Sequence, residues 1–286
     1  MPSSISPSLP STAHPAALAR LQAVGTSHDD VRRYSRARRN VLPRADHVAA
    51  VSGGWAHEVV LAGDATIEVA LWCPGDRAHP TLEATAAVAA VRARRAYRIS
   101  ERTLARLQPE ASAPALLSLV RLPRWEPERV LTGAARLVLV ADGIEYAGNL
   151  GTLVRTADAC AADALVLTNA TARVTHPKAF TASRGTVLTT PVLSYPTVAA
   201  ARTDLDAAGF TAYVADPAGA TPYRSAGLGR GRTAVVVGSE SDGVAPAWRE
   251  GLTRVAIPMR GRADSLNVAA SAAVLLFEAR AVLDGC

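Results

Sequence analysis

The chain has 286 residues, of which 49% are hydrophobic and 20% charged, with a formal net charge of +6. This length and composition predict a globular protein of one large or two modest domains. No apolar run is long enough to cross a bilayer, and residues 1–27 lack the basic and apolar segments of a signal peptide. We therefore expect a cytoplasmic protein without a membrane partner, beginning with a flexible Ser/Pro-rich tail over residues 1–27.

The cysteines and histidines argue against a metal site or a disulfide framework. The three cysteines are far apart, and the six histidines include no pair at helical ligand spacing. The positive charge comes almost entirely from arginine, since Lys178 is the only lysine. A modest positive balance favours a polyanionic partner but does not identify one.

The first predicted element is a helix over residues 28–40, HDDVRRYSRARRN, which carries a cluster of arginines. One interpretation is a solvated helix face, and the other is a surface that faces RNA phosphates. We expect the second role for Arg32, Arg33, Arg36 and Arg39.

The following segments alternate between apolar runs and helical patterns. We predict strands over residues 57–63 and 67–73, a helix over 80–93, and a strand entering a helix over 97–107. Residues 28–108 are therefore predicted to form a small α/β domain. Residues 109–130, rich in proline, are predicted to connect two domains, with a short extended piece in the middle.

From residue 131 to residue 286 the alternation is sharper. Predicted strands cover residues 135–143, 164–170, 186–195, 210–217, 233–241 and 253–259. Predicted helices cover residues 149–162, 176–183, 197–209, 244–252 and 265–283. Continuous Val, Leu, Ile and Ala runs indicate strands buried on both faces, hence a mostly parallel sheet, which binds ligands at the carboxyl ends of its strands.

Polar residues follow three of these strands. In ADGIEYAGNLGTLVRTADA, a strand ends at Asp142, Asn149 is a natural N-cap, and Arg155 interrupts an apolar helix pattern. In VVVGSESDG, two glycines bracket Glu240 in a tight loop. In VAIPMRGRADSLNV, a polar turn precedes a nearly all-apolar helix, which capping by Asp264 or Ser265 explains in part.

The order and spacing of GNLGTLVRTA, VVGSESDG and IPMRGRADSLNVAASAAVLLFE resemble the SpoU/TrmH family of RNA ribose 2′-O-methyltransferases, within the SPOUT superfamily. The resemblance covers residues 131 to 283, and FTASRGTV, which contains Arg184, looks like a further family segment. The chain departs from the family pattern in that loop, since the family's usual proline before Gly148-Asn149 is replaced by Ala147. The resemblance implies an α/β fold whose C-terminal parallel sheet is tied in a deep trefoil knot. The preceding α/β module resembles, in topology alone, a ribosomal-protein-like RNA-binding domain.

The resemblance also implies a site and a reaction. S-adenosylmethionine would bind in the knot against Gly238, Ile257, Met259 and Leu266, and Arg184 would contact RNA. Arg155 matches the family's catalytic arginine, and because arginine side chains keep their charge in proteins, a role in holding phosphate and stabilising oxyanion charge is favoured over a role as base. The other matching catalytic positions, which orient Arg155, the ribose and the loops, are Asn149, Glu240, Ser265 and Asn267. The family's active site lies at a homodimer interface, which would explain the apolar closing helix.

The implied reaction is methylation of a ribose 2′-hydroxyl in ribosomal RNA, with 23S rRNA as the expected substrate. The Arg-rich composition and layout also resemble enzymes that confer resistance to thiostrepton or avilamycin. Two alternatives stay open: a tRNA ribose methyltransferase, and a non-catalytic RNA-binding protein of the same fold. A nicotinamide-dependent dehydrogenase is disfavoured, because the glycines of GLGRGR, residues 227–232, precede a strand and so lack a helix N-terminus for pyrophosphate.

Overall fold

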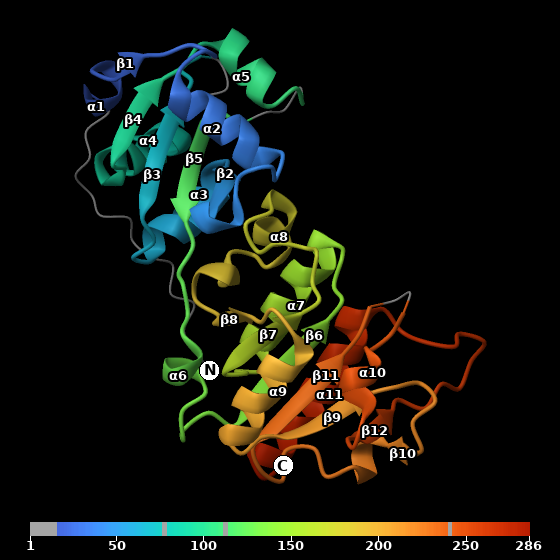
Figure 1. Ribbon diagram of the computed structural model, residues 1–286. Coiled ribbons are helices and arrows are strands. Elements are labelled where there is room, and N and C mark those ends of the chain that lie inside the picture. Colours follow the sequence, from blue (N-terminus) through green and yellow to red (C-terminus); the bar gives the residue numbers. More distant parts are fainter. Residues whose placement is uncertain (1–15, 76–78, 111–113, 240–241) are drawn as a thin grey trace. The chain divides into compact units, whose positions relative to one another are not determined.

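The computed structural model describes residues 16–75, 79–110, 114–239 and 242–286 (Figure 1). Its contacts divide the chain into two compact units. The first unit comprises the chain up to Pro123 together with Thr175–Thr181. The second comprises Arg124–Val174 and Ala182–Cys286.

The first unit contains a five-stranded mixed sheet in the order β1-β4-β3-β5-β2. Strands β1, β4 and β3 are mutually parallel, whereas β5 is antiparallel to both β3 and β2. The strands are β1 (Gln22–Ala23), β2 (Val48–Ser52), β3 (Ile67–Trp72), β4 (Arg95–Arg98) and β5 (Leu116–Arg121). The helices are α1 (Ala16–Ala19), α2 (Asp29–Arg38), α3 (Gly54–Ala62), α4 (Pro80–Arg92) and α5 (Glu101–Leu107).

The structure confirms the helices expected near residues 28–40 and 80–93, but the strand predicted over residues 57–63 is wrong. That segment belongs to helix α3, whose buried residues Ala56, His57, Val60 and Leu61 recur with helical periodicity. His57 is fully buried, and its Nδ1 donates to the Gly53 carbonyl oxygen at 2.7 Å, while its Nε2 lies 2.8 Å from Ser118 Oγ. Burial lowers the pKa of His57 to about 4, so the ring is neutral. Tertiary packing has overridden the strand preference of two adjacent valines.

The first unit also extends beyond residues 28–108 at both ends. The extended piece expected inside the connection over residues 109–130 is β5, which is almost entirely buried between β3 and β2. At the other end, β1 pairs with β4 and Leu18 is buried, so residues 16–27 are not part of a tail. Both segments are too short to show a period, and their strand pairing is decided by partners distant in the sequence.

The second unit contains a seven-stranded sheet in the order β10-β12-β9-β11-β6-β7-β8, and every pair in it is parallel. The strands are β6 (Leu137–Asp142), β7 (Ala164–Thr168), β8 (Val192–Ser194), β9 (Thr211–Ala215), β10 (Thr221–Pro222), β11 (Thr233–Val237) and β12 (Thr253–Ala256). Every residue of β6, β7 and β11 is buried, which confirms the parallel sheet expected from continuous apolar runs. The strand predicted over residues 186–195 is shorter: Thr186–Leu188 form a 3₁₀ turn, and only β8 is extended.

The helices after β5 are α6 (Pro127–Val130), α7 (Ala147–Ala159), α8 (Pro177–Ala182), α9 (Val198–Ala207), α10 (Pro246–Arg249) and α11 (Val268–Leu283). Helices α7 and α11 pack on each other, and α11 also packs on β11 and β6 (Figure 1). Helices α9 and α10 contribute Val198, Ala201, Leu205 and Trp248 to a core with β6, β7, β9 and β11. The parallel strands of the second unit thus end along one edge of the sheet, where polar loops gather.

Candidate functional site

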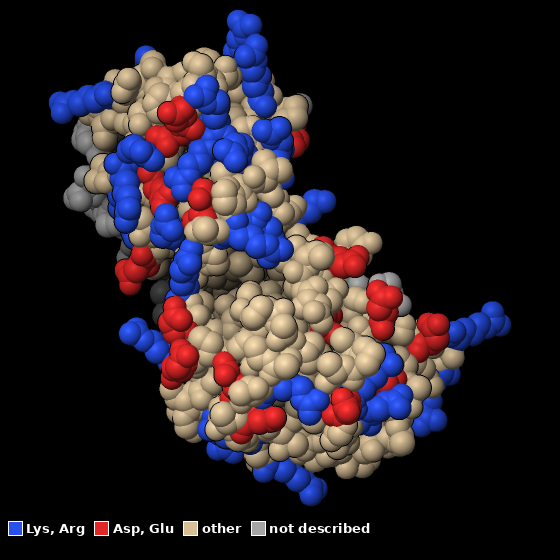
Figure 2. Space-filling view, in the orientation of Figure 1, with Lys and Arg blue, Asp and Glu red and all other residues tan. Residues whose placement is uncertain are grey.

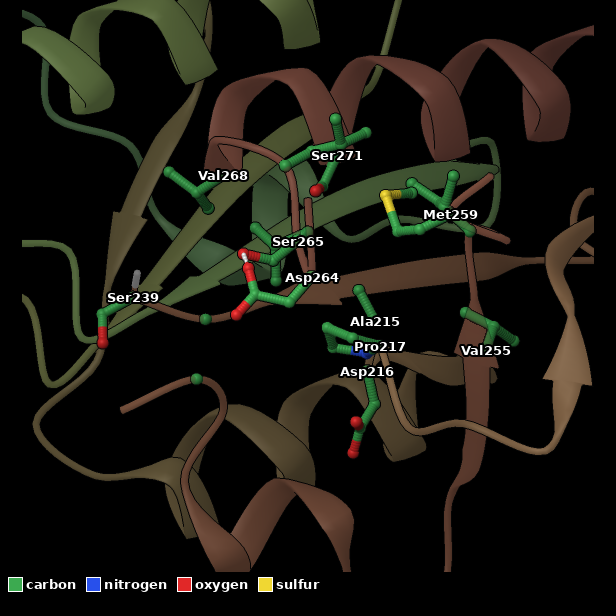
Figure 3. A pocket seen from close by; sticks show the side chains of 15 residues that line it. Ala215, Asp216, Pro217, Ser239, Val255, Met259, Asp264, Ser265, Val268 and Ser271 are labelled. Atoms are coloured by element: carbon green, nitrogen blue, oxygen red, sulfur yellow. Dashed lines mark hydrogen bonds between the residues drawn. The ribbon is translucent and has the colours of Figure 1, made fainter. Parts of the chain in front are cut away.

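A cavity of about 350 Å³ lies in the second unit at the carboxyl ends of β12, β9 and β11, which are neighbours in the sheet. The loops after these strands and the turn before α11 form its walls (Figure 3). The lining residues are Ala215, Asp216, Pro217, Val237, Gly238, Ser239, Gly243, Val255, Ile257, Met259, Asp264, Ser265, Leu266, Val268 and Ser271. All four residues predicted to bind a cofactor, Gly238, Ile257, Met259 and Leu266, are among them, as is Ser265.

The loop after β11 is built around Gly238, where no side chain fits. A Cβ at this position would lie 2.1 Å from the Gly243 carbonyl carbon and 2.3 Å from Val244 N. Ser239 and Gly243 exchange two backbone hydrogen bonds of 3.1 Å, which close the loop, and Gly243 has a φ of +66°. The glycines therefore let two backbone segments approach within contact distance beside the cavity. Glu240, predicted to be catalytic, lies outside the described residues.

The turn before α11 connects the cavity to helix α7. Asn267, and not Asp264 or Ser265, is the N-cap of α11, and its Oδ1 accepts a hydrogen bond of 3.0 Å from Ala269 N. Asn267 Nδ2 also donates to Asn149 Oδ1 at 3.5 Å. In Figure 3 the Ser265 hydroxyl and the Asp264 carboxylate point toward each other, with 3.5 Å between Ser265 Oγ and Asp264 Oδ1. Two predicted catalytic residues from distant motifs, Asn149 and Asn267, are thus in contact.

Arg155 lies on α7, away from the residues that line the cavity. The helix begins at Ala147 after Tyr146, so Asn149 is its third residue and not its N-cap. Arg155 is therefore about 9 Å further along the helix axis than Asn149. Its side chain is exposed and makes no hydrogen bond or ion pair within the described parts of the chain. Arg155 is thus available to a charged partner that is not part of the described chain.

Asp142, the last residue of β6, organises the loops beside the cavity, although the sequence indicated only that a strand ends there. Its side chain is 2% exposed and accepts three hydrogen bonds. Asp142 Oδ1 accepts from Thr168 Oγ1 at 2.8 Å and from Asn169 Nδ2 at 2.7 Å, and Oδ2 accepts from Ala245 N at 2.7 Å. The carboxylate therefore joins the ends of β6 and β7 to the segment that follows the Gly238 loop. A buried acid at a strand end was the signal that could have revealed it.

Asp216 fixes the loop after β9 on the opposite side of the cavity. Its carboxylate accepts from Ala218 N at 2.9 Å and from Arg254 Nε at 2.8 Å, and in Figure 3 it points away from Asp264 and Ser265. Burial alone would raise the pKa of Asp216, but the Ala218 and Arg254 hydrogen bonds and the Arg254 charge lower it below its ordinary value. Asp216 is therefore ionised and paired.

The arginines of α2 have different surroundings from one another. Arg32 pairs with Asp29 at 2.5 Å, and Arg39 Nε donates to the Ser35 carbonyl oxygen at 3.3 Å. Arg33 is largely buried and pairs with Glu68 at 2.6 Å, an acid that also pairs with Arg121. Arg36 is exposed, with no side-chain partner in the described parts of the chain. Arg33 thus holds the fold of the first unit together, whereas Arg36 faces solvent.

Arg184, also predicted to contact RNA, follows α8. It is exposed and adopts a left-handed backbone conformation, with φ +56°, directly before Gly185, with φ +84°. Within the described ranges, no three or more His, Cys, Asp or Glu side chains are arranged to hold a metal ion. The same residues include no helix long and apolar enough to span a membrane.

The second unit is thus an α/β domain with a ligand cavity at the carboxyl edge of a parallel sheet. The model of the SpoU rRNA Methylase family matches residues 136–277, which include the cavity, α7 and most of α11. The chain is 31% identical over 187 residues to the 23S rRNA (guanosine(2553)-2′-O)-methyltransferase RlmP of Bacillus subtilis, covering 64% of this chain and 72% of that protein. The chain belongs to the SpoU rRNA methylase family.

Other relatives match over smaller shares of their length. The chain is 27% identical over 179 residues to the 23S rRNA (uridine(2479)-2′-O)-methyltransferase of Streptomyces viridochromogenes, covering 58% of this chain and 60% of that protein. It is 36% identical over 147 residues to the 23S rRNA (guanosine-2′-O-)-methyltransferase RlmB of Xanthomonas axonopodis, covering 50% of this chain and 57% of that protein.

Solved structures match over both units. The crystal structure of an RNA 2′-O ribose methyltransferase has a TM-score of 0.74 and 28% identity, and the match covers 93% of this chain and 99% of that one. An AdoMet-bound rRNA methyltransferase from Sinorhizobium meliloti has a TM-score of 0.78, with 92% of this chain and 98% of that one covered. At 21% identity, this second match shows a shared fold alone.

Proposed function

We propose that this protein is an S-adenosylmethionine-dependent methyltransferase that modifies a ribose 2′-hydroxyl of ribosomal RNA, with 23S rRNA as its substrate. The observation that carries the proposal is the cavity at the ends of β12, β9 and β11, formed by the motifs that the SpoU family model matches. The curated relatives named above are 23S rRNA 2′-O-methyltransferases. We further propose that the modification protects a ribosome from an antibiotic, a narrower expectation that is supported by the Arg-rich composition and layout of the chain.

The residues of the cavity fit S-adenosylmethionine. A cavity of about 350 Å³ is within the usual range for small-ligand sites. Ile257, Met259, Leu266 and Val268 would provide apolar walls for the adenine ring, and backbone groups beside Gly238 would offer it hydrogen-bond partners. The described lining includes the carboxylate of Asp264 and no Lys or Arg, which suits a cationic ligand.

When bound, S-adenosylmethionine supplies a methyl group on a sulfonium, a carrier that is already activated. The protein must then align the ribose hydroxyl with this methyl group and favour loss of the hydroxyl proton. The Asn149–Asn267 contact holds α7 against the cavity rim, and Ser265 and Asp264 form the adjacent wall. A guanidinium group offers hydrogen-bond donors and no acceptor, so Arg155 would bind an RNA phosphate and stabilise negative charge instead of accepting a proton.

We also propose that the active site is completed by a second copy of the chain. Arg155 lies on α7 and outside the cavity, and α11 leaves Phe277 49% and Val282 37% exposed. A second copy packed on this helix would remove these apolar side chains from water. In a homodimer formed on this face, Arg155 of one subunit would serve the cavity of the other.

Two finer features of the fold belong to this proposal. We propose that the C-terminal segment is threaded as a trefoil knot, supported by β11 lying between β9 and β6 and by the loop at Gly229 pressing against α11. A Cβ at Gly229 would lie 2.2 Å from the Ala279 carbonyl oxygen. A crystal structure of the protein tests the threading of the C-terminal segment directly.

The second feature concerns the first unit, which is proposed to bind RNA.

The direct test of the activity has two stages. Calorimetry with S-adenosylmethionine should show binding, and incubation with labelled cofactor and 23S rRNA should give a ribose-methylated nucleotide that mass mapping locates. If the protein binds the cofactor but methylates tRNA transcripts instead of 23S rRNA, the substrate is tRNA and the proposed substrate class is wrong. Absence of cofactor binding would support the non-catalytic alternative.

Subunit mixing tests the shared active site. Arg155→Ala and Leu266→Arg should each be inactive alone, the second because it puts a cation into the cofactor cavity. A heterodimer of the two variants contains one unmodified Arg155 and one unmodified cavity, on different subunits. It can therefore be active only if each active site combines Arg155 of one subunit with the cavity of the other. Recovered activity on co-refolding supports the dimer, and continued inactivity in verified heterodimers contradicts it. Arg155→Ala should still bind S-adenosylmethionine.

A further inference from the structure

A group of arginines lies at one edge of the first unit, apart from those of α2. Arg98 is the last residue of β4, and Arg102 and Arg106 lie one turn apart on α5. All three side chains are exposed. Arg106 Nη1 reaches Thr26 Oγ1 at 3.4 Å, which places α5 beside the segment that follows β1. We call Arg98, Arg102 and Arg106 the β4–α5 basic edge.

This edge has no internal charge compensation. Within the described ranges, none of its three guanidinium groups forms an ion pair, and the Thr26 contact is its one side-chain hydrogen bond. The neighbouring acid, Glu101, lies toward Gly75 instead, where a Cβ on the glycine would be 2.7 Å from Glu101 Oε1. Like charges one helical turn apart repel each other, so Arg102 and Arg106 weaken α5 slightly in the free protein.

Three of the four arginines of helix α2 show the opposite arrangement, and Arg36 is the exception, with no side-chain partner in the described parts of the chain. Arg32, Arg33 and Arg38 pair with Asp29, Glu68 and Glu110, respectively. An arginine that already binds a carboxylate must release it before it can bind a phosphate, so its net gain is smaller. The uncompensated arginines of the β4–α5 edge gain the full interaction with an anion. Figure 2 shows Lys and Arg side chains gathered over much of the visible face of the first unit. The β4–α5 basic edge therefore differs from α2 in its lack of ion pairs within the described part of the chain, more than in its number of positive charges.

The surface at this edge has a depression. The segments that follow β1, β3 and β4 surround a depression of about 490 Å³. Its lining residues are Ala23, Val24, Gly25, Pro74, Arg98, Ile99 and Ser100. Since β1, β4 and β3 are parallel neighbours, this is the carboxyl edge of their part of the sheet, where ligands of α/β sheets commonly bind.

We propose that the β4–α5 basic edge binds the phosphate backbone of the substrate RNA and is a main anchoring surface of the first unit. Guanidinium groups bind phosphate through paired, charge-assisted hydrogen bonds, and such contacts fix position without selecting sequence. The proposal rests on the function proposed above, since it takes ribosomal RNA as the ligand.

The test compares two double variants with the same charge change. Arg98→Gln/Arg102→Gln removes two arginines of the edge. Arg44→Gln/Arg94→Gln removes two exposed arginines elsewhere in the first unit, one before β2 and one at the opposite end of β4. Binding of transcribed 23S rRNA is measured against salt concentration, and S-adenosylmethionine binding is measured by calorimetry.

The edge variant should bind RNA about tenfold more weakly at low salt, and its log–log salt dependence should fall by about one unit for each lost phosphate contact. The control variant should bind like the unmodified protein, and Arg98→Lys/Arg102→Lys, which keeps the charge, should retain most of the affinity. S-adenosylmethionine binding should not change in any variant.

Equal RNA affinity of the edge and control variants would overturn the proposal, whether both stay unchanged or both weaken. If the unmodified protein itself neither binds nor methylates 23S rRNA, the proposed function fails instead. The two failures are therefore distinguishable.

Discussion

Both units have a hollow at the carboxyl ends of their parallel strands, but the charged side chains around the two hollows have opposite sign. In the second unit, the carboxyl ends of β12, β9 and β11 enclose an apolar cavity with Asp264 on its wall and Asp216 paired to Arg254. In the first unit, the carboxyl ends of β1, β4 and β3 surround a shallow hollow beside Arg98 and Arg102. One edge suits a small cationic cofactor, and the other suits a polyanion. Parallel strands thus determine where a ligand binds, and the loop side chains determine which ligand it is.

If this division holds, cofactor binding and RNA binding can be disrupted separately. Gly238→Ala should produce the largest effect, because a Cβ there overlaps the Gly243 carbonyl carbon at 2.1 Å. Displacing that loop should weaken S-adenosylmethionine binding roughly a hundredfold and leave RNA affinity unchanged. The control is Gly231→Ala, where a Cβ meets nothing within 4 Å. Unchanged S-adenosylmethionine binding by Gly238→Ala would show that the Gly238 loop does not contribute to cofactor binding.

Glu68→Gln addresses the first unit alone. Glu68 is buried and accepts from Arg33 Nη1 at 2.6 Å and from Arg121 Nε at 2.7 Å. Its loss leaves Arg121 without an ion-pair partner among the described residues and Arg33 with only Asp46 at 3.7 Å, which should lower the unfolding free energy of this unit by about 3 kcal/mol. Chemical denaturation with Glu83→Gln as control measures this. A matching loss of cofactor affinity would show that the units do not act independently.

Asp142→Asn should have a moderate effect on the second unit. All three groups that contact this carboxylate are donors, so the new amide must place a donor against a donor. We expect the affinity for S-adenosylmethionine to fall about tenfold, because the segment after the Gly238 loop loses its anchor. Asp158→Asn, the same change at an exposed position on α7, should have no effect. Unaltered affinity in the Asp142 variant would remove it as a positioning residue.

The smallest effect concerns acid pH. The pKa of Asp216 is lowered in the folded protein, as is that of Glu68, where burial opposes the hydrogen bonds from Arg33 and Arg121. A lowered folded pKa gives stability that is present above the unfolded value, about 4, and is lost as the pH falls through the folded value. Thermal unfolding should therefore show a decline below about pH 4 that is smaller in Asp216→Asn. An identical decline in that variant would exclude a contribution from Asp216.

The sequence by itself determined the parallel sheet of the second unit and the position of its site. Continuous apolar strands, followed by Gly238, Ile257 and Leu266, are local patterns, and the structure brings these residues to one cavity. The resemblance to the SpoU/TrmH family implied that Asn149 and Asn267 belong to one site, and the two side chains are in contact, although helix α7 begins two residues earlier than Asn149. The sheet is encoded in hydrophobic periodicity, whereas the site residues were indicated by the resemblance of their motifs to the SpoU/TrmH family.

Only the tertiary structure decided the rest. Residues 57–63 look like a strand, but residues 57–62 belong to helix α3, in which His57 contacts Ser118, 61 residues away. The partners of Arg33, Asp142 and Asp216 are likewise remote in the sequence. An arginine's charge is visible in the sequence, whereas whether a carboxylate already neutralises it depends on long-range contacts. That physical difference separates Arg33, which supports the fold, from Arg98, which is exposed and forms no ion pair within the described ranges.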